Sequence, residues 1–494
     1  MRRNPLLVTA LAITAAIAVW GLLDPQGMAA WAARGVAEQF TSRGWFIMLV
    51  ASALLIAAIL LAISPLGRIR LGGDDERPEF GTVSWLTMLF AAGMGVGLLY
   101  YGAAEPITHF GLFRGYVADP EAASLALLAT YFNWGLHAWA IYGMVGLVMA
   151  YFAFRRGGAM VLSTPITGVL GDHGWPKALG FVVDLLAIVA IAIGLAGSLA
   201  LGVFQVQEGV ARLLGLADAR LLTLPIFGLL CVAFILPLTV DLSKGMALMS
   251  NTAMAIAGAL LVFLILVGNT HVVMNALVEG FGSYVVQAIP MGFTAFTFFD
   301  ETVQGWFQTW TLNYMIWWLA WAPFVGVFIA RISRGRTIRE FLLCVVGIPS
   351  AFSVVWFGTF GALGFSEVIA GDERLVVATQ NAFDSVTFAI LESFPLAPVT
   401  SLAIVVAVFL FVVTSVVSAA YTLAMFATRG DVDPPTRTKL IWAVILAALG
   451  LVMILSGDVE AVRSIIGVFA IAFVFIAPLL LLCLGKALAR EPRP

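Results

Sequence analysis

The sequence predicts an all-α integral membrane protein with about 12 transmembrane helices. Of its 494 residues, 62% are hydrophobic and only 11% are charged, and the mean hydropathy is +1.03. A soluble chain of this length needs far more polar residues to cover its surface. Apolar runs of about 20 residues recur from end to end, each long enough to cross a bilayer as a helix. Helices are expected because lipid offers the backbone no hydrogen-bond partners.

The apolar runs place the spans. The first run follows Arg2 and Arg3 and is interpreted as an uncleaved span, since no convincing small-residue cleavage site follows it. The stretch 271–300 is only moderately apolar and contains Pro290 and Gly292, so it is expected to be a helix along the membrane face. The spans are expected near 6–23, 45–63, 82–104, 125–153, 178–206, 220–238, 247–268, 306–330, 341–362, 397–426, 440–456 and 464–485.

The distribution of Lys and Arg predicts the orientation. With the N-terminus inside, 19 of the 26 basic residues fall in cytoplasmic segments and 7 fall outside. This is the bias that the positive-inside rule requires. We therefore expect a protein of the cell's inner (plasma) membrane with both termini in the cytoplasm. The outside set is Arg34, Arg43, Arg114, Arg212, Arg220, Arg374 and Arg463.

Several classes of function are excluded by composition. A net charge of −2 gives no sign of a nucleic-acid partner. The three cysteines lie scattered in apolar stretches, which suggests neither a disulfide framework nor a metal cluster. No hydrophilic domain and no catalytic pair interrupts the spans, so the chain is not expected to be an enzyme.

The third span contains the glycine run Gly93-Met94-Gly95-Val96-Gly97. Three glycines at alternate positions weaken a helix by roughly 1 kcal/mol each. Transporters use such interruptions to free backbone carbonyls for a cation or to let a substrate approach the backbone. Close packing of neighbouring helices is the alternative interpretation, and the glycines alone leave it open.

Spans four and eight are rich in aromatic residues. Tryptophan in a membrane helix usually marks the water interface, and that interpretation suits Trp306 and Trp310 near the end of span eight. Trp317, Trp318 and Trp321 lie toward the middle of the same span, where helical spacing makes them neighbours. Aromatic faces attract cations that carry no hydrogen-bond donors, so this group predicts a quaternary ammonium site.

Polar groups within the spans have two interpretations each. Thr414 and Ser415, with Phe411, either bond back to the preceding helical turn or help to hold a small hard cation such as sodium. Glu105, His137 and Asp184 are functional candidates because ionisable groups are costly in lipid, and they can equally anchor hydrogen bonds. The basic segment 331–340 is a positive-inside stop signal that can also carry inner-gate contacts or bind anionic lipid.

At these residues the sequence resembles the betaine/choline/carnitine transporter family. The resemblance covers nearly the whole chain and is strongest at 91–110 (AAGMGVGLLYYGAAEPITHF), 131–155 (YFNWGLHAWAIYGMVGLVMAYFAFR) and 310–341 (WTLNYMIWWLAWAPFVGVFIARISRGRTIREF).

The resemblance implies a leucine-transporter-like inverted repeat of five plus five helices, preceded by two extra helices, in a homotrimer embedded in membrane lipid. The two leading helices would occupy 1–80 and the first repeat 81–270. A periplasmic connecting segment at 271–304 would lead to the second repeat at 305–486 and a short cytoplasmic tail at 487–494, without the long charged tail of osmotically activated members.

The resemblance also implies site residues. The family's substrate cage and the glycine-run residue beside it match Trp134, Trp139, Tyr142, Trp318, Trp321 and Met94, with Trp317 adjacent. The family's sodium site matches Ala91, Met94, Phe411, Thr414 and Ser415. A second family sodium site uses a threonine where this chain has Leu195, so one sodium ion is expected and a second is doubtful.

The implied activity is sodium-coupled symport of a quaternary-ammonium zwitterion by alternating access. Choline-preferring members often have an aspartate at the position of Gly97, so glycine betaine or a similar compound, such as dimethylsulfoniopropionate, is expected. Sodium-independent exchange of carnitine-like compounds and proton-coupled choline uptake remain the alternatives.

Overall fold

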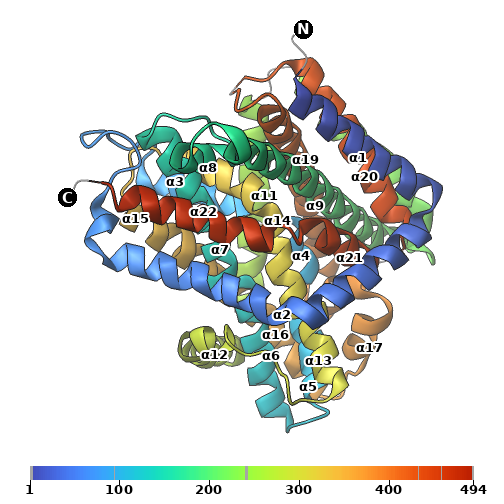
Figure 1. Ribbon diagram of the computed structural model, residues 1–494. Helices are drawn as coiled ribbons and strands as arrows, with labels where there is room; N and C mark the ends of the chain where they lie inside the picture. Colours follow the sequence, from blue (N-terminus) through green and yellow to red (C-terminus); the bar gives the residue numbers. More distant parts are fainter. Residues whose placement is uncertain (1–3, 94, 240–242, 432, 458, 492–494) are drawn as a thin grey trace.

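The chain is a bundle of helices (Figure 1). The structure, a computed structural model, describes residues 4–93, 95–239, 243–431, 433–457 and 459–491. Within these residues, β-type pairing is confined to an isolated bridge between Arg70 and Thr337. Among the described helices, eleven are long and apolar enough to cross a membrane, and a bent pair would make a twelfth. The predicted all-α membrane fold is confirmed.

The helices of the first part are α1 (Pro5–Leu23), α2 (Pro25–Ile63), α3 (Thr82–Gly93), α4 (Val96–Tyr101), α5 (Ala104–Phe113), α6 (Asp119–Trp134), α7 (Leu136–Ala150), α8 (Ser163–Leu170), α9 (Gly174–Leu214), α10 (Thr223–Thr239), α11 (Ser243–Val267) and α12 (Thr270–Met291). Those of the second part are α13 (Glu301–Phe307), α14 (Asn313–Ile332), α15 (Ile338–Leu342), α16 (Ile348–Ile369), α17 (Arg374–Asn381), α18 (Val386–Glu392), α19 (Ala397–Ala427), α20 (Thr436–Leu455), α21 (Val459–Ala470) and α22 (Phe473–Leu488). Short 3-10 or π segments are η1 (Pro65–Arg68), η2 (Tyr151–Arg155), η3 (Ala219–Leu222), η4 (Gln308–Leu312), η5 (Leu343–Gly347) and η6 (Phe383–Ser385).

Among the described residues, spans three and four are interrupted near the centre of the bundle. The expected break in span three is present, because α3 ends at Gly93 and α4 begins at Val96. Span four was expected to be continuous over 125–153, but it breaks between α6 and α7 at Gly135. A Cβ at Gly135 would lie 2.2 Å from the hydroxyl oxygen of Tyr284, so the close approach of α12 excludes a side chain there. Both breaks free backbone groups inside the bundle.

The helix α12 has a different direction from the long helices α9 and α22. Figure 1 shows it almost end-on, whereas α9 and α22 lie in the plane of the view. Its length and composition would also allow it to span a membrane. Its direction agrees with the predicted helix along the membrane face. Because α12 could also span a membrane, that placement stays a prediction.

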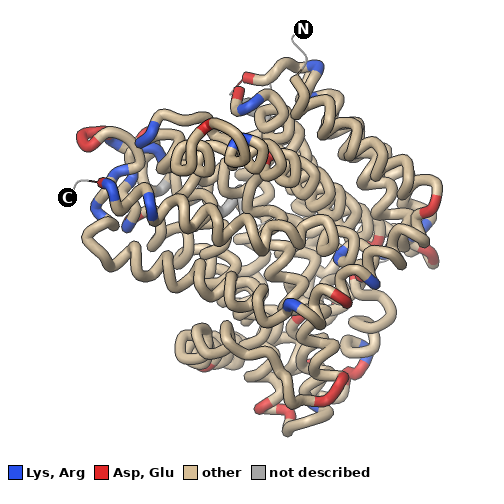
Figure 2. The backbone as a smooth tube through the Cα atoms, viewed as in Figure 1, with Lys and Arg blue, Asp and Glu red and all other residues tan. Residues whose placement is uncertain are grey.

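Lys and Arg gather mainly on the side of the molecule that holds both chain ends, at the upper left of Figure 2. We call this side, formed by segments 64–81 and 331–340, the basic end. The two segments are joined by backbone hydrogen bonds, since Leu71 N donates to Arg336 O (2.8 Å) and Gly335 N donates to Leu71 O (2.8 Å). The connections before α3 and after α14 are thereby held together.

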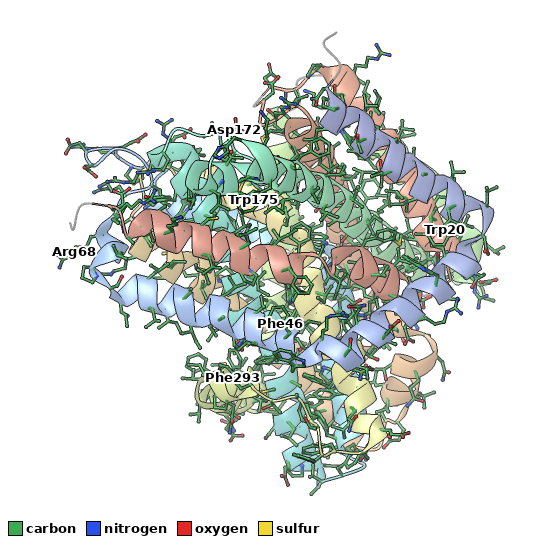
Figure 3. All side chains as sticks on the ribbon, viewed as in Figure 1. Trp20, Phe46, Arg68, Asp172, Trp175 and Phe293 are labelled. Carbon is green, nitrogen blue, oxygen red and sulfur yellow. The ribbon has the colours of Figure 1, made fainter. Side chains whose placement is uncertain are left out.

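The outside of the bundle is apolar. Large side chains project from it, among them Trp20, Trp175 and Phe293 (Figure 3), and Trp175 is 66% exposed. A soluble monomer rarely exposes so much apolar surface, whereas lipid covers it without cost. The polar groups that matter for function therefore lie inside the bundle.

Candidate functional site

A small cavity lies where the broken spans meet α14. Its volume is about 40 Å³, which holds a few water molecules. Backbone of the glycine run forms one side, and aromatic rings from α6, α7 and α14 form most of the rest. The lining residues are Gly95, Val96, Gly97, Leu98, Tyr101, Trp134, Tyr142, Ser198, Tyr314, Trp317, Trp318 and Trp321. We call this the central cavity.

The rings of the central cavity support one another. Trp318 packs edge-to-face against Trp134 (centroids 5.2 Å apart) and against Tyr142 (5.4 Å), and it stacks on Tyr314 (6.0 Å). These are the offset and T-shaped geometries that aromatic quadrupoles prefer. All four rings are buried, so their faces lie in a medium of low dielectric, where attraction to a cation is strongest.

Glu105 of α5 fixes the orientation of two of these rings. Its Oε2 accepts hydrogen bonds from Trp134 Nε1 (2.7 Å) and from the Tyr314 hydroxyl (2.6 Å). Its Oε1 accepts one from Asn133 Nδ2 (2.9 Å) and lies 3.3 Å from His109 Nε2. Glu105 is fully buried. Hydrogen bonds to a carboxylate are stronger than neutral ones, so Glu105 anchors the cavity, which is one of the two roles its sequence position allowed.

Freed carbonyls at the two breaks are also satisfied by side chains. Trp318 Nε1 donates to Asn133 O (2.8 Å), next to the break at Gly135. Leu98 O accepts from Trp356 Nε1 (3.0 Å) and Leu99 O accepts from Gln205 Nε2 (2.9 Å). These hydrogen bonds stabilise both interruptions, because they pair buried carbonyls near each break.

The structure brings together most of the predicted substrate residues. Trp134, Tyr142, Trp317, Trp318 and Trp321 all line the central cavity. Trp139 does not; it packs edge-on against Tyr142 with ring centroids 5.7 Å apart. Met94 lies outside the described residues.

Trp321 lies over a glycine of α9. A Cβ at Gly194 would lie 2.8 Å from Trp321 Nε1, so a glycine is needed for the ring to fit. This indole N–H has no hydrogen-bond partner among the described residues, and it borders the cavity. The adjacent Leu195 is buried.

Two lining tyrosines and a serine were not predicted as substrate residues. Tyr101 lies four residues after the glycine run and is fully buried, and Tyr314 precedes the tryptophan group by one helical turn. The spacing of Tyr314, three and four residues before Trp317 and Trp318, was the available signal. Ser198 of α9 carries no comparable signal in the sequence.

The interpretation of Trp306 and Trp310 as interface anchors was wrong. Both are buried, at 8% and 7% exposure. Trp306 Nε1 donates to His109 Nδ1 (3.0 Å), and Trp310 packs edge-on against the His109 ring at 4.8 Å. A π-helical turn, η4, carries Trp310 inward, and such turns are frequent at functional sites.

The residues of the predicted sodium site are only partly described. Met94 and the side chain of Ala91 lie outside the description. Thr414 Oγ1 donates to Leu410 O (2.9 Å), so its lone pairs remain able to accept or coordinate. A Cβ at Gly95 would lie 3.7 Å from Ser415 Oγ, so this hydroxyl borders the break in span three. Phe411 is buried in the same helix.

The other intramembrane ionisable residues have structural partners. Asp184 Oδ1 accepts a hydrogen bond from Ser163 N (2.9 Å) at the start of α8. His137 Nε2 lies 3.4 Å from Ser52 Oγ, which donates in turn to Gly292 O (2.8 Å). Both residues therefore act as connectors between helices.

Two larger cavities lie at opposite ends of the α13–α14 run. The first, of about 850 Å³, opens at the basic end, and we call it the basic-end cavity. Its lining includes Phe324, Arg331 and Arg334 from α14 and the following loop. Arg331 pairs with Glu79 (3.1 Å) and Arg334 pairs with Glu76, so the predicted basic segment is tied to the loop before α3.

The second, of about 770 Å³, lies at the opposite end, and we call it the distal vestibule. Its lining includes Trp310, Phe383 and Arg463 on the side of the central cavity. Its charged lining residues are Glu208, Asp218, Arg220, Asp384, Glu460 and Arg463. Burial, with a further contribution from the Glu208 carboxylate, raises the pKa of Asp384 to about 6.

Comparison with known proteins gives consistent matches. A model of the family described as "betaine/carnitine/choline family transporter" matches residues 5–493. The chain is 37% identical over 485 residues to the glycine betaine transporter OpuD of Bacillus subtilis (strain 168), covering 98% of this chain and 94% of the relative. It is 33% identical to a probable glycine betaine transporter of Desulfitobacterium hafniense (strain Y51), covering 98% and 96%. It is 36% identical to a glycine betaine/proline/choline/ectoine transporter of Vibrio parahaemolyticus, covering 91% and 80%.

Proposed function

Because the chain belongs to the betaine/carnitine/choline transporter family, we propose that it takes up a betaine-type zwitterion by sodium-coupled symport with alternating access. The chain is a multi-span membrane transporter and not an enzyme. The observation that carries the proposal is the central cavity, whose walls are aromatic rings held by a buried carboxylate.

The cavity suits a trimethylammonium group. Such a head has no hydrogen-bond donor, so it cannot pair well with carbonyls or hydroxyls, but its spread charge is attracted to ring faces. Glu105 accepts hydrogen bonds from Trp134 and Tyr314, which makes both rings richer in electron density. At about 40 Å³ the cavity is smaller than the ligand, so the rings must move apart when it binds.

The preference for a zwitterion is supported at Gly97. A Cβ at this position would lie 3.0 Å from Trp134 Cη2. An aspartate there would require Trp134 to shift. Because the glycine run has no acidic residue, it provides no counter-charge for a cationic substrate that lacks a carboxylate. A betaine brings its own carboxylate. Similar relatives are named for glycine betaine transport, and we propose glycine betaine as the first substrate to test.

The two larger cavities are the two access routes in this proposal. Each is separated from the central cavity by a layer of aromatic rings, and opening one layer at a time would give alternating access. We assign the basic end to the cytoplasm of a cell with this protein in its plasma membrane, following the distribution of Lys and Arg. The two five-helix repeats, which would run from α3 to α11 and from α14 to α22, and a homotrimer are part of the same proposal.

Sodium is proposed as the co-transported ion. Thr414 and Ser415 would supply hydroxyl oxygens, and carbonyls near the break between α3 and α4 would complete a set of hard oxygen ligands. The Ser415 hydroxyl lies beside Gly95, which lines the central cavity, so ion binding would stabilise the broken span in the form that binds substrate.

The test is uptake of labelled glycine betaine into proteoliposomes, with and without an inward sodium gradient. We expect accumulation that requires the gradient and that Thr414→Ala abolishes, while Thr400→Ala, a back-bonded threonine near the start of the same helix, retains it. Equally fast uptake without sodium would refute the coupling. Counterflow driven only by substrate on both sides would identify an exchanger instead.

A further inference from the structure

Arg463, at the start of α21, is a buried cation that contacts rings instead of acids. It is 5% exposed, although it was expected in an outside loop. Its Cζ lies 4.1 Å from the ring centroid of Trp310 and 4.9 Å from that of Tyr101, and its Nε donates to the Tyr101 hydroxyl (3.2 Å). Among the described residues, no carboxylate lies within ion-pair distance of the guanidinium.

One edge of this guanidinium has no hydrogen-bond partner among the described residues. The Nη2 atom is buried and makes no hydrogen bond to the described residues. A buried N–H that loses water without gaining a partner costs free energy, and a buried charge costs more. Cation–π contacts offset part of that cost, but they leave the Nη2 donors without a partner among the described residues. The Nη2 donors are therefore available to bind an anion.

Arg463 lies on the route from the distal vestibule to the central cavity. It lines the vestibule with Trp310, while its hydrogen-bond partner Tyr101 lines the central cavity. A solute that passes between the two cavities at Tyr101 and Trp310 therefore passes this group. A guanidinium presents parallel N–H donors that match the two oxygens of a carboxylate.

The remaining charges of the vestibule do not serve as its partner. Glu208 pairs with Arg212 (2.7 Å), which also pairs with Glu392. The vestibule has four acidic lining residues against two basic ones, so its walls attract a cationic head. The solute that suits both the acidic walls and the buried arginine carries a cationic head and an anionic tail.

We propose that Arg463 recognises the carboxylate of the incoming zwitterion and thereby selects betaines over onium cations that lack a carboxylate. This inference rests on the proposed function and deepens it. A zwitterion brings a carboxylate to the unpaired Nη2 while its head moves toward the central cavity. An onium cation without a carboxylate meets an uncompensated positive charge at the same place, which disfavours it.

The test compares two ligands in one assay. Labelled glycine betaine uptake gives a KM, and inhibition of that uptake by tetramethylammonium, which has no carboxylate, gives an inhibition constant. For Arg463→Gln we expect the KM for betaine to rise about tenfold or more, while tetramethylammonium inhibits as well as before or better. Arg463→Lys keeps the charge and should recover part of the betaine affinity. Arg34→Gln, which removes an exposed arginine that does not line the vestibule, is the control and should change neither value by more than about twofold.

The outcomes separate the inference from the proposed function. If wild-type protein accumulates betaine and Arg463→Gln weakens both ligands equally, or neither, Arg463 has only a structural role and the inference is wrong. If wild-type protein moves no betaine, the proposed function fails, and thermal stabilisation by betaine and by tetramethylammonium tests the selectivity on its own. If Arg463→Gln does not fold, Arg463→Lys must show the same loss of selectivity in smaller measure.

Discussion

The central cavity is closed in different ways at its two ends. Toward the distal vestibule, Tyr101 packs against Phe383 (5.5 Å) and Trp310 (6.3 Å), and Arg463 lies among them. Toward the basic end, Trp321 borders the central cavity and Phe324 borders the basic-end cavity, with their rings 6.0 Å apart. We call these the distal closure and the basic-end closure.

The difference lies in what supports each closure. Tyr101, Trp310 and Arg463 of the distal closure are buried, and a hydrogen bond joins Tyr101 to Arg463. Tyr314, whose ring packs against Tyr101 (5.8 Å), donates to the buried Glu105 carboxylate. The basic-end closure is a single ring pair, and beyond it the chain is joined by partly exposed ion pairs such as Arg331–Glu79. Exposed pairs contribute about 0–1 kcal/mol, whereas a buried unpaired donor costs about 1–3 kcal/mol. The basic-end closure is therefore the easier one to open.

The largest effect is expected at Glu105. Glu105→Ala removes the acceptor for Trp134 Nε1, Asn133 Nδ2 and the Tyr314 hydroxyl, at about 1–3 kcal/mol for each buried donor. We expect uptake to fall by about a hundredfold or more and the unfolding temperature in detergent to drop. Glu105→Gln keeps an acceptor and should lose less. If Glu105→Ala takes up substrate at the wild-type rate, the carboxylate does not support the distal side.

A smaller effect is expected at Trp318, which lines the central cavity between the two closures. Trp318→Ala removes a buried ring face and should weaken substrate binding by about 1–2 kcal/mol, or roughly five- to thirtyfold. Isothermal titration calorimetry with glycine betaine measures this loss of affinity. Trp45→Ala, at a side chain that is 62% exposed, is the matched control and should leave affinity unchanged. An unchanged affinity in Trp318→Ala would remove this ring from the site.

The ion pairs beyond the basic-end closure should matter less. Arg334→Ala breaks an exposed pair with Glu76, so its effect on KM should stay below about threefold and should shrink further in high salt. The double variant Arg334→Glu/Glu76→Arg, which exchanges the two charges, should restore the wild-type KM. A loss as large as that of Glu105→Ala would reverse the comparison between the two closures.

The smallest effect concerns pH in the distal vestibule. With its pKa raised to about 6, Asp384 is ionised at neutral pH and gains a proton as the pH falls through that value. The charged groups that act on it are Glu208, Arg212 and Arg220. Inhibition by tetramethylammonium, which does not titrate, should weaken about twofold from pH 7.5 to about pH 5. Asp384→Asn should remove this dependence, and an unchanged profile in that variant would exclude Asp384 as the cause.

The sequence predicted the fold and the aromatic character of the site because both depend on local signals. Apolar runs locate helices wherever the chain lies in lipid, and the spacing of Trp317, Trp318 and Trp321 follows from helix geometry alone. The glycine run predicted the break before α4, since glycines weaken a helix whatever surrounds them.

What remained hidden depends on contacts between distant segments. The break at Gly135 follows from the approach of Tyr284, about 150 residues away in the chain. Trp310 points inward because of a π-helical turn, which shifts the helical face in a way that regular spacing does not reveal. The charge of Arg463 led to its prediction in an outside loop. It is buried because α21 places its guanidinium against the ring of Trp310.

The central claim is that the cavity binds an onium head through cation–π attraction. The most direct measurement compares binding of glycine betaine and of 3,3-dimethylbutyrate, which has the same shape and carboxylate but a neutral tert-butyl head. Isothermal titration of the purified protein should show betaine binding about tenfold tighter or more, because several rings face the charge. Equal affinity for the two compounds would contradict the account, since shape and the carboxylate alone would then explain binding.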